Sequence, residues 1–146
     1  MRGYKVTMKQ YINDKLDNFN REHCVQSKLD SYDGDYKRQW KKDYKEIENS
    51  LWSKIMSVSD VLDYVDRYVA SVEREEKLNV TYLDIYDTDL ALYRATYAIR
   101  KMAQCYDNPN CDFDTFGKDE IDNLFIKLER SYSKMKQELF RRSMND

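Results

Sequence analysis

The residues of this chain that could do chemistry are its acidic, cysteine and histidine side chains, and their spacing predicts no metal or catalytic site. The single histidine, His23, is followed by Cys24, and the other two cysteines are Cys105 and Cys111. Zinc sites are typically marked by CxxC pairs or by histidines about three to five residues apart, and neither spacing occurs here. Adjacent helical side chains point about 100° apart, which argues against a nucleophile made by Cys24 and His23. We therefore expect no metal and no cofactor.

Two groups of aspartates resemble cation ligands by their spacing alone. Asp60, Asp63 and Asp66 follow one another at steps of three, and residues 112–117 imitate the beginning of an EF-hand loop. The imitation fails at the twelfth position, where a bidentate glutamate is needed and Asn123 stands. Acidic side chains are favoured near helix N-termini without any ligand. Because the chain also lacks a glycine-rich phosphate loop and a GxSxG motif, we expect no enzyme.

The first candidate binding surface combines basic and aromatic residues within 37–45. The surface comprises Lys37, Arg38, Trp40, Lys41, Lys42 and Lys45. Basic groups neutralise phosphates and aromatic rings stack on bases, so this pattern indicates a nucleic-acid interface. Asp43, Glu46 and Glu48 interrupt the positive charge, so a solvated helix face is the competing interpretation.

The second candidate surface rests on the tyrosines, of which the chain has 13. Tyrosine is enriched at protein interfaces because it joins a large apolar ring to a hydroxyl. Tyr64 and Tyr68 stand four residues apart, on one helix face, and we expect an exposed docking patch there because valines fill the core positions of that segment. Tyr82 and Tyr86 form a further pair that we assign to protein binding. A tyrosine-rich bundle core is the alternative.

The composition predicts an all-α fold in a single domain over residues 1–146. The chain has 3 glycines and 1 proline, too few for the turns that a sheet protein needs. Apolar residues make up 41% and charged residues 36%, which suits helices with one buried face. We find no apolar run long enough to span a membrane and no signal-peptide pattern. Together with the odd cysteine count, this favours a reducing cytoplasm, although a Cys105–Cys111 bridge stays open.

Apolar residues at steps of three and four predict a bundle of about five helices. The predicted helices span approximately residues 7–22, 35–56, 59–77, 82–105 and 117–142. Thr7, Asp35, Ser57 and Gly117 stand where N-caps are expected. A second cap at residues 87–89 would divide the fourth helix in two, and we favour the continuous version.

The last predicted helix carries a heptad seam. The seam comprises Ile121, Leu128, Met135 and Leu139, with further apolar residues between them. Such a seam either packs inside the bundle or joins two copies in a homodimer. Charge is also unevenly distributed, because a strongly acidic middle stands between two basic ends, a pattern that suits attraction within the domain or a basic partner.

These features predict a non-enzymatic adaptor or regulator that binds another protein. The size and composition suggest a phage, viral or mobile-element protein that modulates or inhibits a host factor. The alternative is a helical nucleic-acid-binding module that uses the basic and aromatic residues of the second predicted helix.

Overall fold

The computed structural model of this chain describes residues 7–23, 32–51, 54, 57–77, 82–106 and 117–145, without the side chains of residues 75–77, 82–84, 142, 143 and 145. The helices of this part of the chain are α1 (Met8–His23), α3 (Gly34–Leu51), α4 (Val58–Lys77), α5 (Tyr82–Cys105) and α6 (Lys118–Asn145). The predicted all-α bundle is therefore confirmed.

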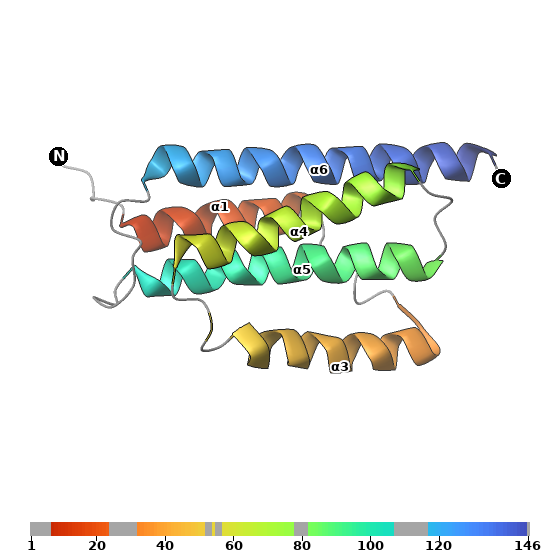
Figure 1. The fold of residues 1–146 in the computed structure, drawn as a ribbon, viewed down its shortest axis with the longest axis horizontal. Coiled ribbons are helices and arrows are strands. Elements are labelled where there is room, and N and C mark those ends of the chain that lie inside the picture. Colours follow the sequence, from red (N-terminus) through yellow and green to blue (C-terminus); the bar gives the residue numbers. More distant parts are fainter. Residues whose placement is uncertain are drawn as a thin grey trace.

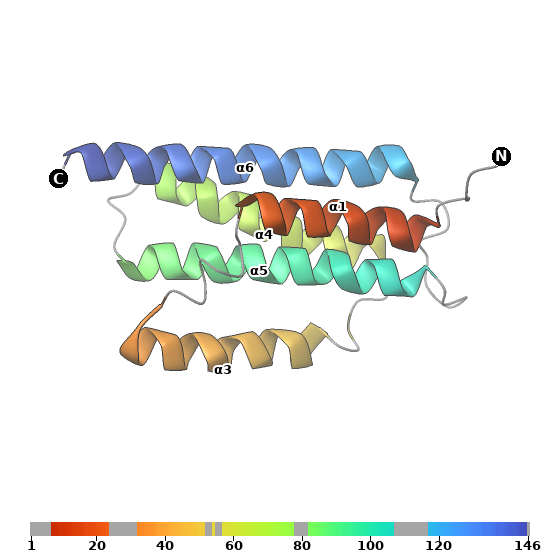
Figure 2. The same cartoon turned by 180° about the vertical axis from the view of Figure 1, so that it is seen from behind.

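Four of the helices form a bundle, and the fifth lies outside it. α1 and α4 lie on opposite sides of the bundle, and each contacts both α5 and α6 (Figures 1 and 2). α3 packs on the outer side of α5, away from α6. α5 therefore contacts three other helices, and small or apolar side chains such as Ala95, Ala98, Ile99 and Met102 are buried along it.

Side-chain caps fix the beginning of two helices as predicted. Thr7 Oγ1 accepts a hydrogen bond from the Gln10 N–H at 3.1 Å, and Ser57 Oγ accepts one from the Asp60 N–H at 3.2 Å. At the start of α6, the Gly117 carbonyl accepts the Ile121 N–H at 3.1 Å, as an N-cap carbonyl does. The sequence therefore places these three helix starts correctly.

α3 begins at a residue other than the one predicted. The Asp33 carbonyl accepts the Lys37 N–H at 3.2 Å, and Gly34 has a φ of 56°, a left-handed conformation that favours glycine. The expected cap at Asp35 is therefore wrong, because the chain already turns into the helix at Gly34. The described part of the helix extends to Leu51, Lys54 lies in a turn, and residues 52, 53, 55 and 56 of the predicted helix lie outside the described residues.

α5 is one continuous helix, as we favoured, and α6 extends three residues beyond the predicted end at residue 142. Thr88 and Asp89 are buried within α5 instead of capping a second segment. Among the described residues, no helix combines the length and the apolar character that crossing a bilayer requires.

The heptad seam of α6 lies inside the chain's own bundle. Ile121, Leu128 and Met135 are buried, and Leu139 is partly buried against the same core. α6 packs on α4 and α1, so these two helices occupy the surface that a homodimer would need. Of the two interpretations of the seam, the internal one fits this packing.

Candidate functional site

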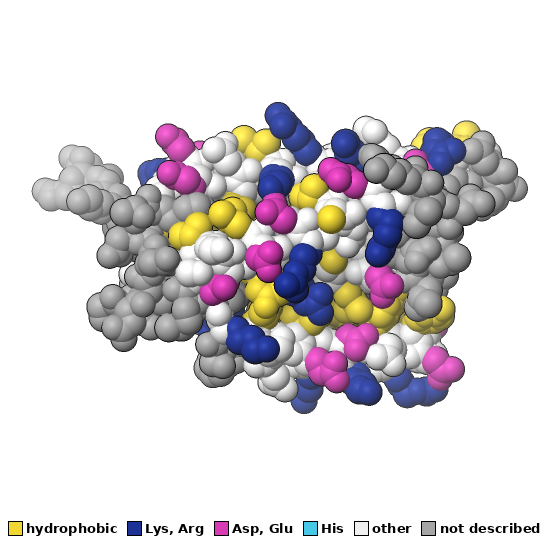
Figure 3. Space-filling view, in the orientation of Figure 1, with side chains coloured by type: hydrophobic (Ala, Val, Ile, Leu, Met, Phe, Trp, Pro, Cys, Tyr) yellow, Lys and Arg dark blue, Asp and Glu magenta, His cyan; other side chains and the backbone are white. Residues whose placement is uncertain are grey.

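The basic residues of α3 lie on the surface, but their predicted aromatic partner does not. Lys37, Arg38, Lys41, Lys42 and Lys45 are exposed, and Figure 3 shows basic and acidic side chains mixed along the lower edge, where α3 lies. Trp40 is only 3% exposed. The expectation that Trp40 stacks on a base is therefore wrong, because its ring packs edge-on against Tyr44 and Tyr93 at centroid distances of 5.2 and 5.4 Å.

The tyrosine pair of α4 is not an exposed patch. Tyr68 is 1% exposed and lies in the core, whereas Tyr64 is half-buried, with the Arg67 guanidinium 5.2 Å from its ring. The expectation of exposure is wrong because Tyr68 follows Val65 by three residues and precedes Val72 by four, and so belongs to the same buried stripe. Tyr64 alone is left at the surface.

The tyrosines of α5 fasten α3 to the bundle. The Tyr86 hydroxyl donates to Asp43 at 2.8 Å, and the Tyr93 hydroxyl donates to Glu48 at 3.0 Å. Burial raises the pKa of both phenols, and the carboxylates that accept their hydrogen bonds raise it further. Tyr86, predicted as a protein-binding residue, therefore packs inside the chain, while the side chain of Tyr82 lies outside the described residues.

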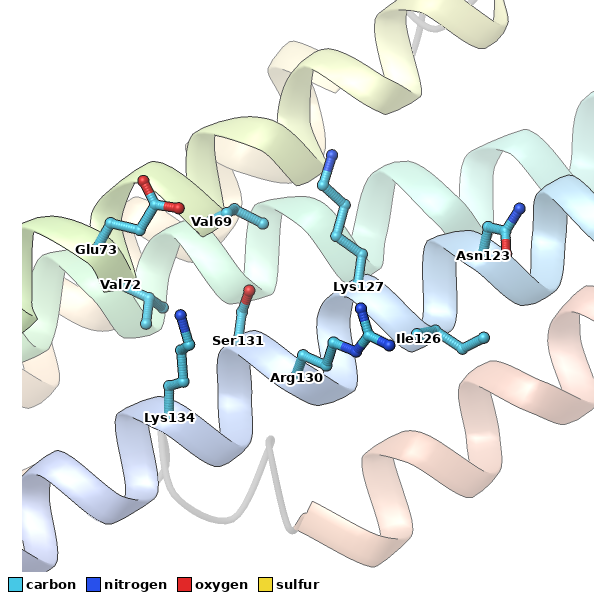
Figure 4. Close-up of a pocket in the computed structure, with 9 residues that line it drawn as sticks. All are labelled: Val69, Val72, Glu73, Asn123, Ile126, Lys127, Arg130, Ser131 and Lys134. Carbon is cyan, nitrogen blue, oxygen red and sulfur yellow. The ribbon is translucent and has the colours of Figure 1, made fainter.

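A groove between α4 and α6 is the clearest candidate binding site (Figure 4). It has a volume of about 360 Å³. Its apolar part consists of Val69 and Val72 from α4 and of Ile126 from α6, whose side chain is 46% exposed. Val72 is only 1% exposed, so the apolar surface that a partner could cover is that of Ile126 beside the half-buried Val69.

Positive charge dominates the rim of this groove. Lys127, Arg130 and Lys134 line it from α6, against the single carboxylate of Glu73 from α4. Lys127 donates to the Asp66 carboxylate of α4, whereas no described residue forms an ion pair with Arg130. We call this surface, with its apolar floor and basic rim, the α4–α6 groove.

A second groove lies on the other side of α6, against α1. Its volume is about 530 Å³. Ile126 and Arg130 line both grooves, so they stand on the ridge of α6 that separates them. Lys15 lines the second groove, and its ammonium lies 3.1 Å from the Asp122 carboxylate.

The sequence did not predict a polar cluster that stands at the end of this second groove. His23 Nε2 lies 2.7 and 2.8 Å from the two carboxylate oxygens of Glu129, although the two residues are 106 positions apart. The neighbouring Glu22 carboxylate also belongs to the cluster, because the ligand atoms of these three residues lie within 4.8 Å of one another. One feature of the sequence could have pointed to Glu129. It follows the seam residue Leu128 and so borders the face of α6 that packs in the bundle.

The zinc, nucleophile and disulfide roles considered for the cysteines involve residues that are mostly not described. Cys24 and Cys111 lie outside the described residues, and Cys105 is half-buried at the end of α5. Residues 112–116 of the EF-hand-like segment lie outside them as well.

Comparisons of the chain with protein-family models, curated proteins and solved structures give no match. The function of the chain must therefore be inferred from the geometry and chemistry of its own candidate sites.

Proposed function

We propose that this chain is a non-enzymatic adaptor or regulator that binds an amphipathic, acidic helix of another protein in the α4–α6 groove. The observation that carries the proposal is the apolar floor with a basic rim. An amphipathic helix lays its apolar face into such a groove, and acidic residues beside that face can pair with Lys127, Arg130 and Lys134.

Ile126 is the residue that we expect to contribute most to binding. It is 46% exposed, so covering it contributes about half of the roughly 1.5–3 kcal/mol that full burial of a large aliphatic side chain provides. Residues of this kind dominate binding when polar groups around them exclude water. Arg130, one helical turn further along α6, supplies a charge that no described residue neutralises.

The biological setting belongs to the same proposal. The size and composition that suggest a phage, viral or mobile-element protein point to a host factor as the partner, and to the cytoplasm as the place of binding. The chain would regulate the other protein by binding its helix, because a helix held in the α4–α6 groove cannot contact its usual partners.

Affinity capture from a native extract tests the proposal with a matched pair of variants. Ile126→Ser/Lys134→Glu changes the groove, and Leu62→Ser/Lys54→Glu likewise replaces an exposed aliphatic residue by serine and an exposed lysine by glutamate, outside both candidate surfaces. We expect mass spectrometry to identify a protein that the wild type and the outer variant retain and the groove variant loses. Circular dichroism confirms that both variants remain helical. Equal retention by the groove variant would show that the partner binds elsewhere.

A second candidate function is nucleic-acid binding through α3, because its five basic side chains are all exposed. Fluorescence anisotropy with labelled DNA and RNA at about 50 and 200 mM salt tests it, since phosphate contacts weaken steeply as salt rises. Lys41→Glu/Lys42→Glu should abolish such binding. If no complex forms at the lower salt concentration, this second function is rejected.

A further inference from the structure

Glu22 and His23 at the end of α1 and Glu129 on α6 form a cluster that resembles a metal-ligand set. One ligand atom from each residue lies within 4.8 Å of the others. We propose that this cluster binds a divalent transition metal ion such as Zn²⁺, with His23 Nε2 and the two carboxylates as ligands. An imidazole nitrogen with carboxylate oxygens is a donor set that suits zinc. The proposal is independent of the α4–α6 groove.

The imidazole of His23 is held in a fixed orientation by its surroundings. Its side chain is 7% exposed. The rings of Phe19 and Tyr132 pack edge-on against it at centroid distances of 4.8 and 4.6 Å, and the Tyr132 hydroxyl donates to the His23 carbonyl at 3.2 Å. A ligand whose orientation is set before binding loses little conformational freedom when the metal arrives.

The contacts within the protein leave this ring only partly satisfied. Nε2 faces both oxygens of Glu129, and Nδ1 is buried with no hydrogen-bond partner among the described residues. An imidazole ring normally uses both of its nitrogens in hydrogen bonds or metal bonds. Among the described residues all polar contacts of the ring are therefore made by Nε2, and this is the nitrogen that would bind the metal.

The two glutamates leave room for a metal ion to enter. Zinc bonds of about 2.0–2.2 Å separate neighbouring ligand atoms by about 3 Å or more, slightly further than Nε2 now lies from the Glu129 oxygens. The Glu129 side chain is 42% exposed and can shift outward, and Glu22 is exposed too. Both line the groove between α1 and α6, so water from that groove would complete the coordination.

The charges around the cluster also favour a cation. This groove is lined by three carboxylates, those of Glu22, Asp122 and Glu129, and by two basic side chains, Lys15 and Arg130. Lys15 forms an ion pair with Asp122. The metal would tie the end of α1 to the middle of α6, and binding to the folded state alone raises the melting temperature.

Metal titration of the purified, chelator-treated full chain tests the inference. We expect Zn²⁺ to raise the melting temperature in a concentration-dependent way and to bind measurably by calorimetry, whereas Mg²⁺, which prefers all-oxygen octahedral sites, should have little effect. Glu22→Gln and Glu129→Gln change exposed or half-exposed side chains and should keep the fold. Each should weaken zinc binding about tenfold or more, because even residues that only support a ligand cost about 10–100-fold when lost.

Glu73→Gln is the matched control, because Glu73 is an exposed glutamate that lines the α4–α6 groove and lies outside the cluster, and it should bind zinc as the wild type does. Co²⁺ in place of zinc gives a second readout, since thiolate ligands produce strong charge-transfer absorption and nitrogen and oxygen ligands do not. The inference is overturned if zinc has no effect, if Glu22→Gln and Glu129→Gln both bind as tightly as the wild type, or if cobalt reports thiolate ligation.

Discussion

At the scale of single residues, Tyr68 combines complete burial with an unmet hydrogen bond. Its hydroxyl has no partner among the described residues, and burial raises its pKa well above the ordinary range, with smaller contributions from Tyr132 and Asp89. A buried polar group without a partner costs about 1–3 kcal/mol. We therefore expect Tyr68→Phe to raise the free energy of unfolding by about 1 kcal/mol, measured by urea denaturation.

Tyr132→Phe is the comparison for that experiment, because the Tyr132 hydroxyl does have a partner in the His23 carbonyl. Removing this bond should lower the free energy of unfolding by about 1 kcal/mol. If Tyr68→Phe is as destabilising as Tyr132→Phe, the hydroxyl of Tyr68 has a hydrogen bond after all.

Asp122 provides a prediction for acid pH. The Tyr11 hydroxyl donates to its carboxylate at 2.5 Å, and this bond, followed by that from Lys15, lowers the pKa of Asp122. A carboxyl whose pKa is lower in the folded state stabilises the fold above its unfolded pKa of about 3.9, and this contribution is lost as the pH falls through the folded pKa. Asp122→Asn should therefore destabilise the chain at pH 7 and much less at about pH 2, as urea midpoints at both pH values will show. An equal difference at both pH values would contradict this assignment.

At the scale of an element, Gly34 decides how α3 begins. Its φ of 56° is a conformation that costs residues with a Cβ atom about 1–2 kcal/mol, while no atom lies within 4 Å of an added Cβ. Gly34→Ala should therefore lower the free energy of unfolding by about 1 kcal/mol through backbone conformation alone, measured by chemical denaturation. Gly34→Asn is the comparison, because asparagine adopts positive φ more readily than alanine does, and it should lower the free energy of unfolding less. Equal losses would assign the effect to something other than φ.

Helix positions could be predicted from the sequence far better than helix neighbours. The spacing of apolar residues and the caps at Thr7 and Ser57 are local, so they identify helices without knowledge of the fold. The beginning of α3 depends on the positive φ of Gly34, which apolar spacing does not report. The burial of Tyr68 was accessible in principle, because its spacing from Val65 and Val72 is that of the valines themselves.

The candidate sites were harder to predict because they are made by pairs of helices. His23 and Glu129 meet only because α1 packs on α6, and no local motif encodes that pairing. The α4–α6 groove likewise needs both helices, although Ile126 could be recognised as an isoleucine just outside the seam. The tyrosine count was interpreted as a sign of protein interfaces, whereas Tyr86 and Tyr93 are buried between α3 and α5 of the same chain, which fits the alternative of a tyrosine-rich core.

At the scale of the whole molecule, the buried tyrosines predict loss of stability at alkaline pH. Burial raises the pKa of Tyr86 and Tyr93 above the unfolded value of about 10. The stability that these phenols contribute is present in full below that value and is lost as the pH rises through their folded pKa. We expect the melting temperature to fall above about pH 10, and the phenolate absorbance to show one early group of tyrosines and one that ionises together with unfolding. If all tyrosines titrate together while the chain stays folded, this account is wrong.

The attachment of α3 mainly to α5 has a consequence for how the molecule opens. Because its rings and hydroxyls meet mainly α5, this helix can detach while α1, α4, α5 and α6 remain assembled, so it forms a cooperative unit of its own. Amide hydrogen exchange should therefore be faster along residues 38–51 than along residues 90–103, with a smaller opening free energy. Identical protection of the two segments would mean that all five helices unfold in a single step.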